Sequence, residues 1–138
     1  MIANLLLSIA MAEITVTYDL PTHHISGQPY TLDIQIFNDG DKVEEIQDLS
    51  SNRWAVSFTV EQDGKQTTLR TTKESDAKKD LVTLQPRGLQ ELRFEVPNAA
   101  AWTTGTVNLN IQTSLSAEPY RHEIVIYPHQ IEQISQPD

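Results

Sequence analysis

The 138-residue sequence contains no cysteine, few basic residues and no long apolar run. Without cysteine the chain has no disulfide framework, no thiolate zinc site and no thiol nucleophile. Its ten Lys and Arg stand against nineteen Asp and Glu, which gives a formal charge of −9. Nucleic acids and anionic membranes both bind clusters of basic residues, so we expect neither as a partner. A chain of this length buries about two thirds of its unfolded surface, enough for one domain without a staple.

The first twelve residues are apolar or small and carry no charged side chain, and the first charge is Glu13. The segment is too short to span a bilayer, which takes about 20 apolar residues. It ends in Ala10-Met11-Ala12. Small residues at the first and third of these positions are typical of a signal-peptidase site. We therefore predict a signal peptide over residues 1–12 and a periplasmic or secreted mature domain that does not insert into a membrane. A first β-strand or an apolar N-terminal tail is the alternative interpretation.

Alternation of apolar and polar residues dominates the rest of the chain, which places every second side chain on one face of a strand. The pattern recurs over residues 14–18, 32–36, 54–60, 92–96 and 107–111, and less cleanly over 120–127. Seven or eight short strands separated by turns are typical of an antiparallel Ig-like or fibronectin-like β-sandwich. We predict this all-β fold for residues 13–128. Residues 129–138 lack periodicity and are expected to form a flexible tail or linker.

Turn residues separate the strand-like runs. Asp63-Gly64 predicts a hairpin with a type I′ turn, which needs a positive φ at both central residues. In the segment 84–88, proline fixes one φ and Gly88 is expected to supply the unusual one. Val43–Leu49 has helical spacing over only two turns, and Ala99–Trp102 is expected to make one helical turn.

The order of these features resembles a known group of modules. The motifs are Gly27-Gln28-Pro29-Tyr30, Asn38-Asp39-Gly40, Trp54-x-Val-x-Phe-x-Val, Asp63-Gly64-Lys65, Leu84-x-Pro86-x-Gly88 and Gly105-x-Val107-x-Leu109-x-Ile111. Together they resemble the bacterial immunoglobulin-like modules, including the BsuPI-type (intracellular proteinase inhibitor) and CARDB-type (cell-adhesion-related) families. The resemblance covers about residues 13–128, implies an Ig-like fold and carries over no functional residue. Antibody-type domains pair a disulfide with the tryptophan, so the lack of cysteine excludes that subclass.

Four histidines provide candidate metal ligands. They are His23, His24, His122 and His129. Adjacent residues of an extended chain point to opposite sides, so the histidines are expected as solvated residues of loops and edge strands rather than as ligands of one Cu or Zn site. For His122, which falls within the last strand, the alternative is a packed, hydrogen-bonded residue, because alternation with Ile124 and Ile126 can turn it inward.

An acidic run surrounds Lys42. Its members are Asp39, Asp41, Glu44, Glu45 and Asp48. Calcium takes six to eight oxygen ligands, which a carboxylate-rich loop can supply, but the EF-hand order is absent because Gly40 comes too early. We expect a solvated acidic loop, with a calcium site as the alternative.

The sequence contains no constellation of a known catalytic chemistry. Ser26 and Ser116 lie in turns without the Gly-x-Ser-x-Gly elbow, and no phosphate-binding glycine motif occurs. Nothing selects a carboxylate pair among the nineteen acids. We therefore expect no enzyme, no catalytic residue, no cofactor and no metal.

Binding remains as the function that the residues favour. Lys73–Asp80 is dense in charge and is expected to form an exposed loop, and loops at the end of a sandwich commonly carry recognition. Trp54 is expected in the core, and Trp102 is expected to close one end of it, with an exposed sugar-stacking platform as the alternative.

We predict a non-catalytic exported module that binds protein or assists assembly in the bacterial envelope, through strand edges and end loops. Two alternatives stay open. One is a BsuPI-like proteinase inhibitor with Lys73–Asp80 as its protruding loop, and the other is a carbohydrate- or calcium-binding module.

Overall fold

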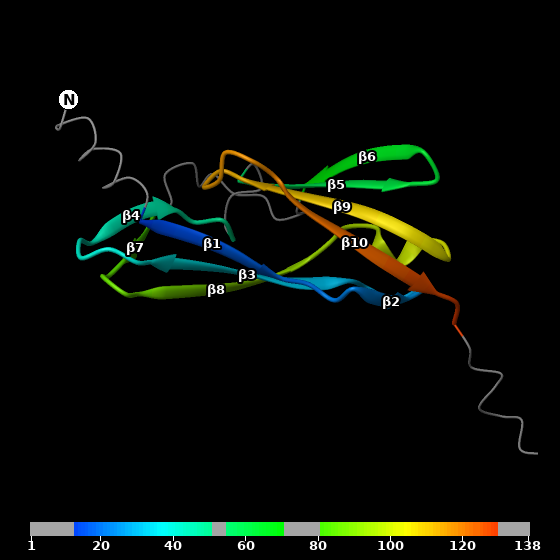
Figure 1. The fold of residues 1–138 in the computed structure, drawn as a ribbon, viewed down its shortest axis with the longest axis horizontal. Helices are drawn as coiled ribbons and strands as arrows, with labels where there is room; N and C mark the ends of the chain where they lie inside the picture. Colours follow the sequence, from blue (N-terminus) through cyan, green and yellow to red (C-terminus); the bar gives the residue numbers. More distant parts are fainter. Residues whose placement is uncertain (1–12, 51–54, 71–80, 130–138) are drawn as a thin grey trace, which may run out of the picture.

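The computed structural model describes residues 13–50, 55–70 and 81–129 (Figure 1). The predicted signal peptide, Trp54, Lys73–Asp80 and residues 130–138 lie outside the described residues. The strands of the described chain are β1 (Ile14–Asp19), β2 (His23–Ile25), β3 (Thr31–Asn38), β4 (Glu44–Gln47), β5 (Val56–Gln62), β6 (Lys65–Arg70), β7 (Leu81–Leu84), β8 (Leu89–Glu95), β9 (Gly105–Thr113) and β10 (Tyr120–Tyr127). A 3-10 helix, η2 (Ala99–Ala101), precedes β9, as predicted. The prediction of an all-β protein is confirmed.

These strands form three sheets. One has the order β1-β3-β8, a second has the order β2-β10-β9-β5-β6, and the third consists of β4 and β7. Every neighbouring pair is antiparallel except β2 and β10, which run parallel over three residues. In Figure 1, β1, β3 and β8 lie in one layer and β10, β9, β5 and β6 lie in the other, with β4 and β7 at one end. Among the described residues, no helix is long and apolar enough to cross a membrane.

The two larger sheets share one hydrophobic core. In β3 every second residue is buried, and β5, β9 and β10 bury alternate residues in the same way. Phe58 of β5 meets Phe94 of β8 edge to face, with ring centroids 6.4 Å apart, so this contact joins the two layers. Each large apolar side chain that is fully buried contributes about 1.5–3 kcal/mol. The period-two pattern in the sequence therefore identifies both the strands and the side chains of the core.

The predicted number of seven or eight strands is wrong, because the described residues contain ten. The additional strands are short, with three residues in β2 and four each in β4 and β7. β4 lies within Val43–Leu49, where the spacing of apolar residues is helical. Two isolated helical turns are marginal in water, whereas β7 supplies antiparallel partners from Glu44↔Leu84 to Gln47↔Leu81. A strand partner distant in sequence thus decides the conformation of this segment.

The turns agree with the sequence at one position and differ at another. Asp63 and Gly64 have φ values of 55° and 80° and join β5 to β6, which confirms the predicted hairpin. At the turn before β8, the residue with a positive φ is Arg87 (65°) and not Gly88. Gly88 is required for a different reason, since a Cβ there would lie 2.8 Å from the carbonyl oxygen of Gln85.

Candidate binding site at the β5–β6 hairpin

Trp102 closes one end of the core, as predicted. Only 7% of the residue is exposed, and its ring centroid lies 5.3 Å from that of Tyr30 and 5.9 Å from that of His24. The rings of His24 and Tyr30 meet edge to face at 5.2 Å. This packing holds the indole in one orientation. The alternative of an exposed sugar-stacking platform is therefore wrong for Trp102.

Tyr30 anchors this aromatic group to the chain segment before β2. Its hydroxyl donates a hydrogen bond to the carbonyl oxygen of Pro21 at 2.5 Å. Burial raises the pKa of the Tyr30 phenol above its ordinary value of 10.0, and the nearby Tyr120 raises it further. The phenol is therefore neutral in the folded protein at physiological pH, with its proton fixed in this hydrogen bond.

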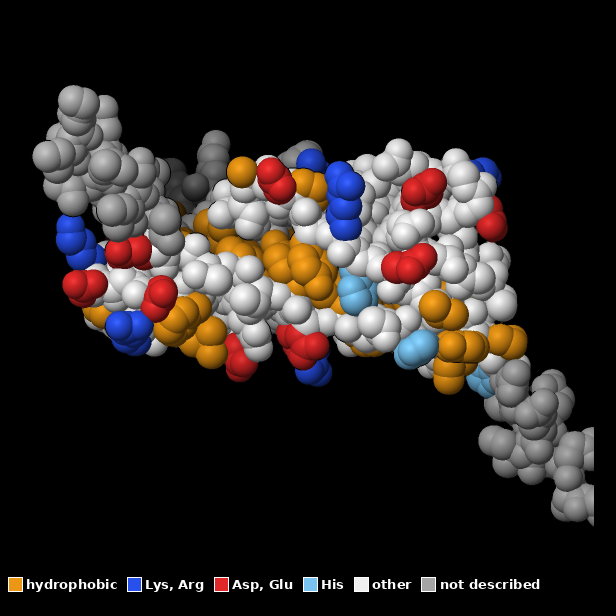
Figure 2. Space-filling model, viewed as in Figure 1, with side chains coloured by type: hydrophobic (Ala, Val, Ile, Leu, Met, Phe, Trp, Pro, Cys, Tyr) orange, Lys and Arg blue, Asp and Glu red, His pale blue; other side chains and the backbone are white. Residues whose placement is uncertain are grey.

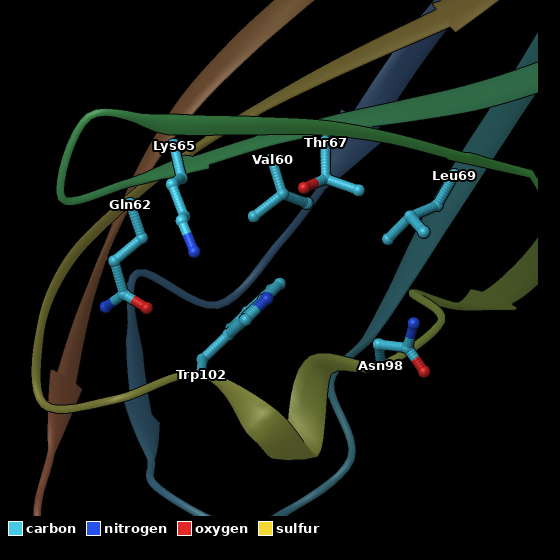
Figure 3. A pocket seen from close by; sticks show the side chains of 7 residues that line it. All are labelled: Val60, Gln62, Lys65, Thr67, Leu69, Asn98 and Trp102. Atoms are coloured by element: carbon cyan, nitrogen blue, oxygen red, sulfur yellow. The ribbon is translucent and has the colours of Figure 1, made fainter.

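A cavity of about 230 Å³ lies between Trp102 and the hairpin formed by β5 and β6 (Figure 3). Its lining consists of Val60, Gln62, Lys65, Thr67, Leu69, Asn98 and Trp102. The five-stranded sheet is two strands wider than the sheet that faces it, and β5 and β6 are the last two strands on this side. Phe58 of β5 is covered by Phe94 of β8, whereas Val60, Thr67 and Leu69 face Asn98 and Trp102 on either side of η2 across the cavity.

The register of the hairpin selects which side chains line the cavity. Val60 lies opposite Thr67, and Gln62 lies opposite Lys65. Side chains of paired residues share one face of a sheet, and the face alternates along each strand. Lys65, Thr67 and Leu69 therefore project on the same side, toward Trp102 and Asn98, as Figure 3 shows.

Gln62 ties the tip of the hairpin to the loop after η2. Its Nε2 donates to the carbonyl oxygen of Thr103 at 2.7 Å, and the Thr103 N–H donates to its Oε1 at 3.1 Å. These two bonds hold this wall of the cavity in place and occupy both the Nε2 and the Oε1 of Gln62. In contrast, Lys65 forms no ion pair with any described residue, and Lys65, Thr67 and Asn98 are all exposed. The cavity thus combines an apolar interior with one available cation and two available neutral polar groups.

β6 also forms the edge of the five-stranded sheet in the described part of the chain. A two-residue hairpin loop makes Gln62 and Lys65 a hydrogen-bonded pair, and the pairs alternate from there along the ladder. The backbone N–H and C=O groups of Gln66 and Thr68 therefore point away from β5. These groups, together with the cavity beneath the same strand, form the candidate binding site.

The histidines occupy separate places. The ring of His23 packs on Tyr127 at 5.5 Å, and His24 faces the aromatic group with its Nε2 2.8 Å from the Gln28 carbonyl oxygen. They diverge, as alternation predicts. His122 is half-buried and stacked on Tyr120, and its Nε2 lies 3.2 Å from the Pro21 carbonyl oxygen, which fits the alternative of a packed histidine. His129 is exposed.

The acidic residues also lie apart. Asp39 forms an ion pair with Arg87 at 2.8 Å, and an Asp48 oxygen accepts hydrogen bonds from Ser50. Figure 2 shows acidic side chains spread over this face of the molecule. Within residues 13–50, 55–70 and 81–129, no group of three or more His, Cys, Asp or Glu could hold a metal ion.

Among the described residues, neither Ser26 nor Ser116 forms a hydrogen bond with a histidine. The Ser26 hydroxyl donates to the carbonyl oxygen of Trp102 at 3.4 Å, and the Ser116 carbonyl accepts from Gln112 at 2.7 Å. The Ser26 hydroxyl therefore connects its turn to the segment after η2, and at Ser116 the recorded bond is to the backbone. The loop proposed for proteinase inhibition, Lys73–Asp80, is not among the described residues.

The sequence did not predict the cavity or the role of Asn38. The wall of the cavity at Asn98 and Trp102 is distant in sequence from the hairpin that covers it. The sequence marks Asn38 only as a turn residue, whereas Asn38 is fully buried. Its side-chain amide donates to the carbonyl oxygens of Lys42 (2.7 Å) and Leu84 (3.1 Å), and its Oδ1 accepts from the Gly40 N–H at 3.0 Å.

No family model matches the sequence, and no curated protein sequence matches it. Among solved structures, the fold is similar to part of a β-glucosidase from Listeria innocua in complex with glucose, with a TM-score of 0.55, 13% identity and coverage of 83% of this chain. That match spans 16% of the β-glucosidase chain. The sporulation control protein Spo0M from Bacillus subtilis matches with a TM-score of 0.48, 12% identity and coverage of 86% and 51% of the two chains.

A CARDB domain from Pyrococcus furiosus in complex with di-metal ions matches with a TM-score of 0.43, 12% identity and coverage of 83% of this chain and 87% of that chain. All three identities are far below the level at which function follows from similarity. The likeness to the β-glucosidase segment concerns the fold alone.

Proposed function

We propose that this chain is a non-catalytic, exported protein-binding module of the bacterial envelope, with an Ig-like β-sandwich fold. It binds an extended segment of a partner along β6, the edge strand of the five-stranded sheet in the described part of the chain. The two large sheets that face each other across one core support the sandwich assignment. The signal-like segment that ends in Ala10-Met11-Ala12 supports export.

The single observation that carries the proposal is the edge position of β6. A partner strand can add to such an edge, where main-chain hydrogen bonds supply affinity and alternate side chains enter pockets that supply specificity. β6 is six residues long and lies directly over the cavity. Lys65 at its start is the kind of charged edge residue that limits uncontrolled pairing, so partner choice depends on the cavity.

The chemistry of the lining supports binding rather than catalysis. It consists of aliphatic, indole, amide, hydroxyl and ammonium groups, with no carboxylate or imidazole among the described residues of the cavity. Imidazole and carboxylate are the groups that general acid–base catalysis uses most often. The apolar and neutral polar lining therefore supports a binding role.

A proline at the edge tests the proposal. Gln66→Pro removes an outward N–H without removing a bond to β5, and proline is tolerated in edge strands. Gln66→Thr keeps the N–H and is the matched control. Peptides are first selected from a random display library on the purified domain. We expect them to bind Gln66→Pro at least about tenfold more weakly than the wild type, and Gln66→Thr normally.

Amide hydrogen exchange locates the contact. Thr68 has an outward N–H, and we expect its exchange to slow when a selected peptide is bound. Equal affinity for Gln66→Pro and the wild type, with no protection at Thr68, would show that the peptides bind elsewhere and would overturn the proposal. Failure of the library to yield any peptide would also contradict it.

A further inference from the structure

We infer that the cavity beneath β6 receives the carboxyl-terminal residue of the partner, with an apolar last side chain against Val60, Leu69 and Trp102 and the α-carboxylate at the Lys65 ammonium. This inference rests on the proposed function and narrows the partner to proteins that end in an extended segment with an apolar last residue.

The cavity matches the two chemical parts of such a terminus. Val60 and Trp102 are each 7% exposed, and the side chain of Leu69 packs against the core from the same face. These groups favour an apolar side chain that would otherwise meet water. Lys65 lies at the rim without an ion pair to any described residue, so its ammonium is available for a carboxylate. Charge-assisted hydrogen bonds of this kind are stronger than neutral ones.

The size of the cavity sets the size of the ligand. Sites for drug-sized molecules or cofactors usually enclose about 300–1,000 Å³, whereas this cavity has about 230 Å³. It therefore suits a single side chain with its terminal carboxylate. The remaining polar groups, the Thr67 hydroxyl and the Asn98 amide, have no recorded hydrogen-bond partner among the described residues and can bond to the same terminus.

The direction of β6 determines which end of the partner reaches Lys65. A strand that adds in antiparallel orientation runs from the Arg70 end of β6 toward Lys65, and β6 has no ladder beyond that residue, since the chain turns at Asp63 and Gly64. A partner that ends where β6 begins therefore places its carboxyl end beside Lys65. Side chains that point to the same face as Lys65 and Thr67 are those directed at the cavity. The direction of the added strand and the charge of Lys65 therefore both favour the carboxyl terminus of the partner.

Two display libraries of random eight-residue peptides test the inference on the purified domain. In one, each peptide is fused through its amino end and has a free carboxylate. In the other, each peptide is fused through its carboxyl end and has none. We expect enrichment in the first library only, with apolar residues at the last position. Synthetic copies of the enriched peptides should bind about tenfold more weakly when amidated.

Lys65→Met provides the matching change in the protein, because it removes the charge and keeps an apolar stem of similar length. We expect it to weaken the free-carboxylate peptides about tenfold and to leave the amidated copies unchanged. Lys42→Met is the control, since Lys42 is also exposed and lies outside the cavity.

The outcomes separate the inference from the proposed function. Equal enrichment in both libraries, with sensitivity to Gln66→Pro, would retain edge binding and overturn the role of the carboxyl terminus. Unchanged binding of free-carboxylate peptides to Lys65→Met would overturn it as well. Enrichment in neither library would contradict both proposals.

Discussion

Asn38 is the buried polar residue with the largest number of recorded side-chain hydrogen bonds in the described chain. It lies at the end of β3 and connects three backbone segments: its own turn at Gly40, the loop at Lys42 and the end of β7 at Leu84. All three partners are backbone groups, one N–H and two carbonyl oxygens. A polar group left unsatisfied in the interior costs about 1–3 kcal/mol. We therefore regard Asn38 as the residue that holds the β4–β7 end of the molecule to β3.

Replacement of Asn38 is expected to be strongly destabilising. Asn38→Ala leaves two carbonyl oxygens and one N–H without this partner, and should lower the free energy of unfolding by about 2–4 kcal/mol. Asn38→Asp should cost more at pH 7, because a buried carboxylate cannot donate to two carbonyl oxygens. Urea denaturation measures both variants. Asn108→Ala, at an exposed position of β9, is the control and should change stability by no more than about 0.5 kcal/mol.

If Asn38→Ala unfolds at the same urea concentration as the wild type, the three hydrogen bonds contribute nothing net. In that case another contact connects the β4–β7 end to β3.

The hairpin of β5 and β6 is the element on which both proposals depend. Its turn has a positive φ at both Asp63 and Gly64, and a Cβ at Gly64 would meet no atom within 4 Å. Gly64→Ala therefore adds backbone strain without a clash. L-residues in this conformation cost about 1–2 kcal/mol. Binding of a selected peptide should weaken in parallel, because the strain acts on the hairpin that carries β6.

Thermal unfolding and peptide titration of Gly64→Ala check this expectation. Gly27→Ala is the comparison, since Gly27 also has a positive φ (90°) with no atom within 4 Å of an added Cβ, but lies outside the hairpin; it should lower stability and leave the affinity for the peptide unchanged. A Gly64→Ala protein with wild-type stability and affinity would show that the turn adapts at no cost.

The elements differ in how far they could be predicted. The hairpin follows from local chemistry, because Asp63-Gly64 specifies its own turn. β4 does not, because its residues have helical spacing and become a strand only through pairing with β7. The turn before β8 lies between these cases: its position follows from Pro86 and Gly88, but the positive φ falls on Arg87. Local signals were thus sufficient where a turn is self-contained and failed where a distant segment chooses the conformation.

At the scale of the whole molecule, one core joins the two large sheets, and the candidate site lies at its margin. Trp102 belongs to both, since it packs on Tyr30 inside and lines the cavity outside. The burial of Trp102 at the end of the core could be predicted from the sequence, because Trp102 follows three alanines and precedes a strand. The cavity could not be predicted in the same way, since it requires the hairpin and η2 to meet in space. Binding at the cavity and the integrity of the core are consequently linked through Trp102 and Tyr30.

The buried Tyr30 phenol makes the free energy of unfolding depend on pH in the alkaline range. Burial raises the pKa of Tyr30 above the ordinary value of 10.0, so the unfolded chain loses this proton at a lower pH than the folded protein does. The resulting stabilisation is complete below about pH 10 and is lost as the pH rises toward the folded-state pKa. Between about pH 10 and 11.5, the wild type should therefore lose up to about 1.4 kcal/mol per pH unit more than Tyr30→Phe. Tyr127→Phe, at a half-exposed tyrosine, is the control for the loss of a phenol hydroxyl as such. Urea titrations across this range decide the matter, because parallel curves for the wild type and Tyr30→Phe would mean that the phenol ionises alike in both states.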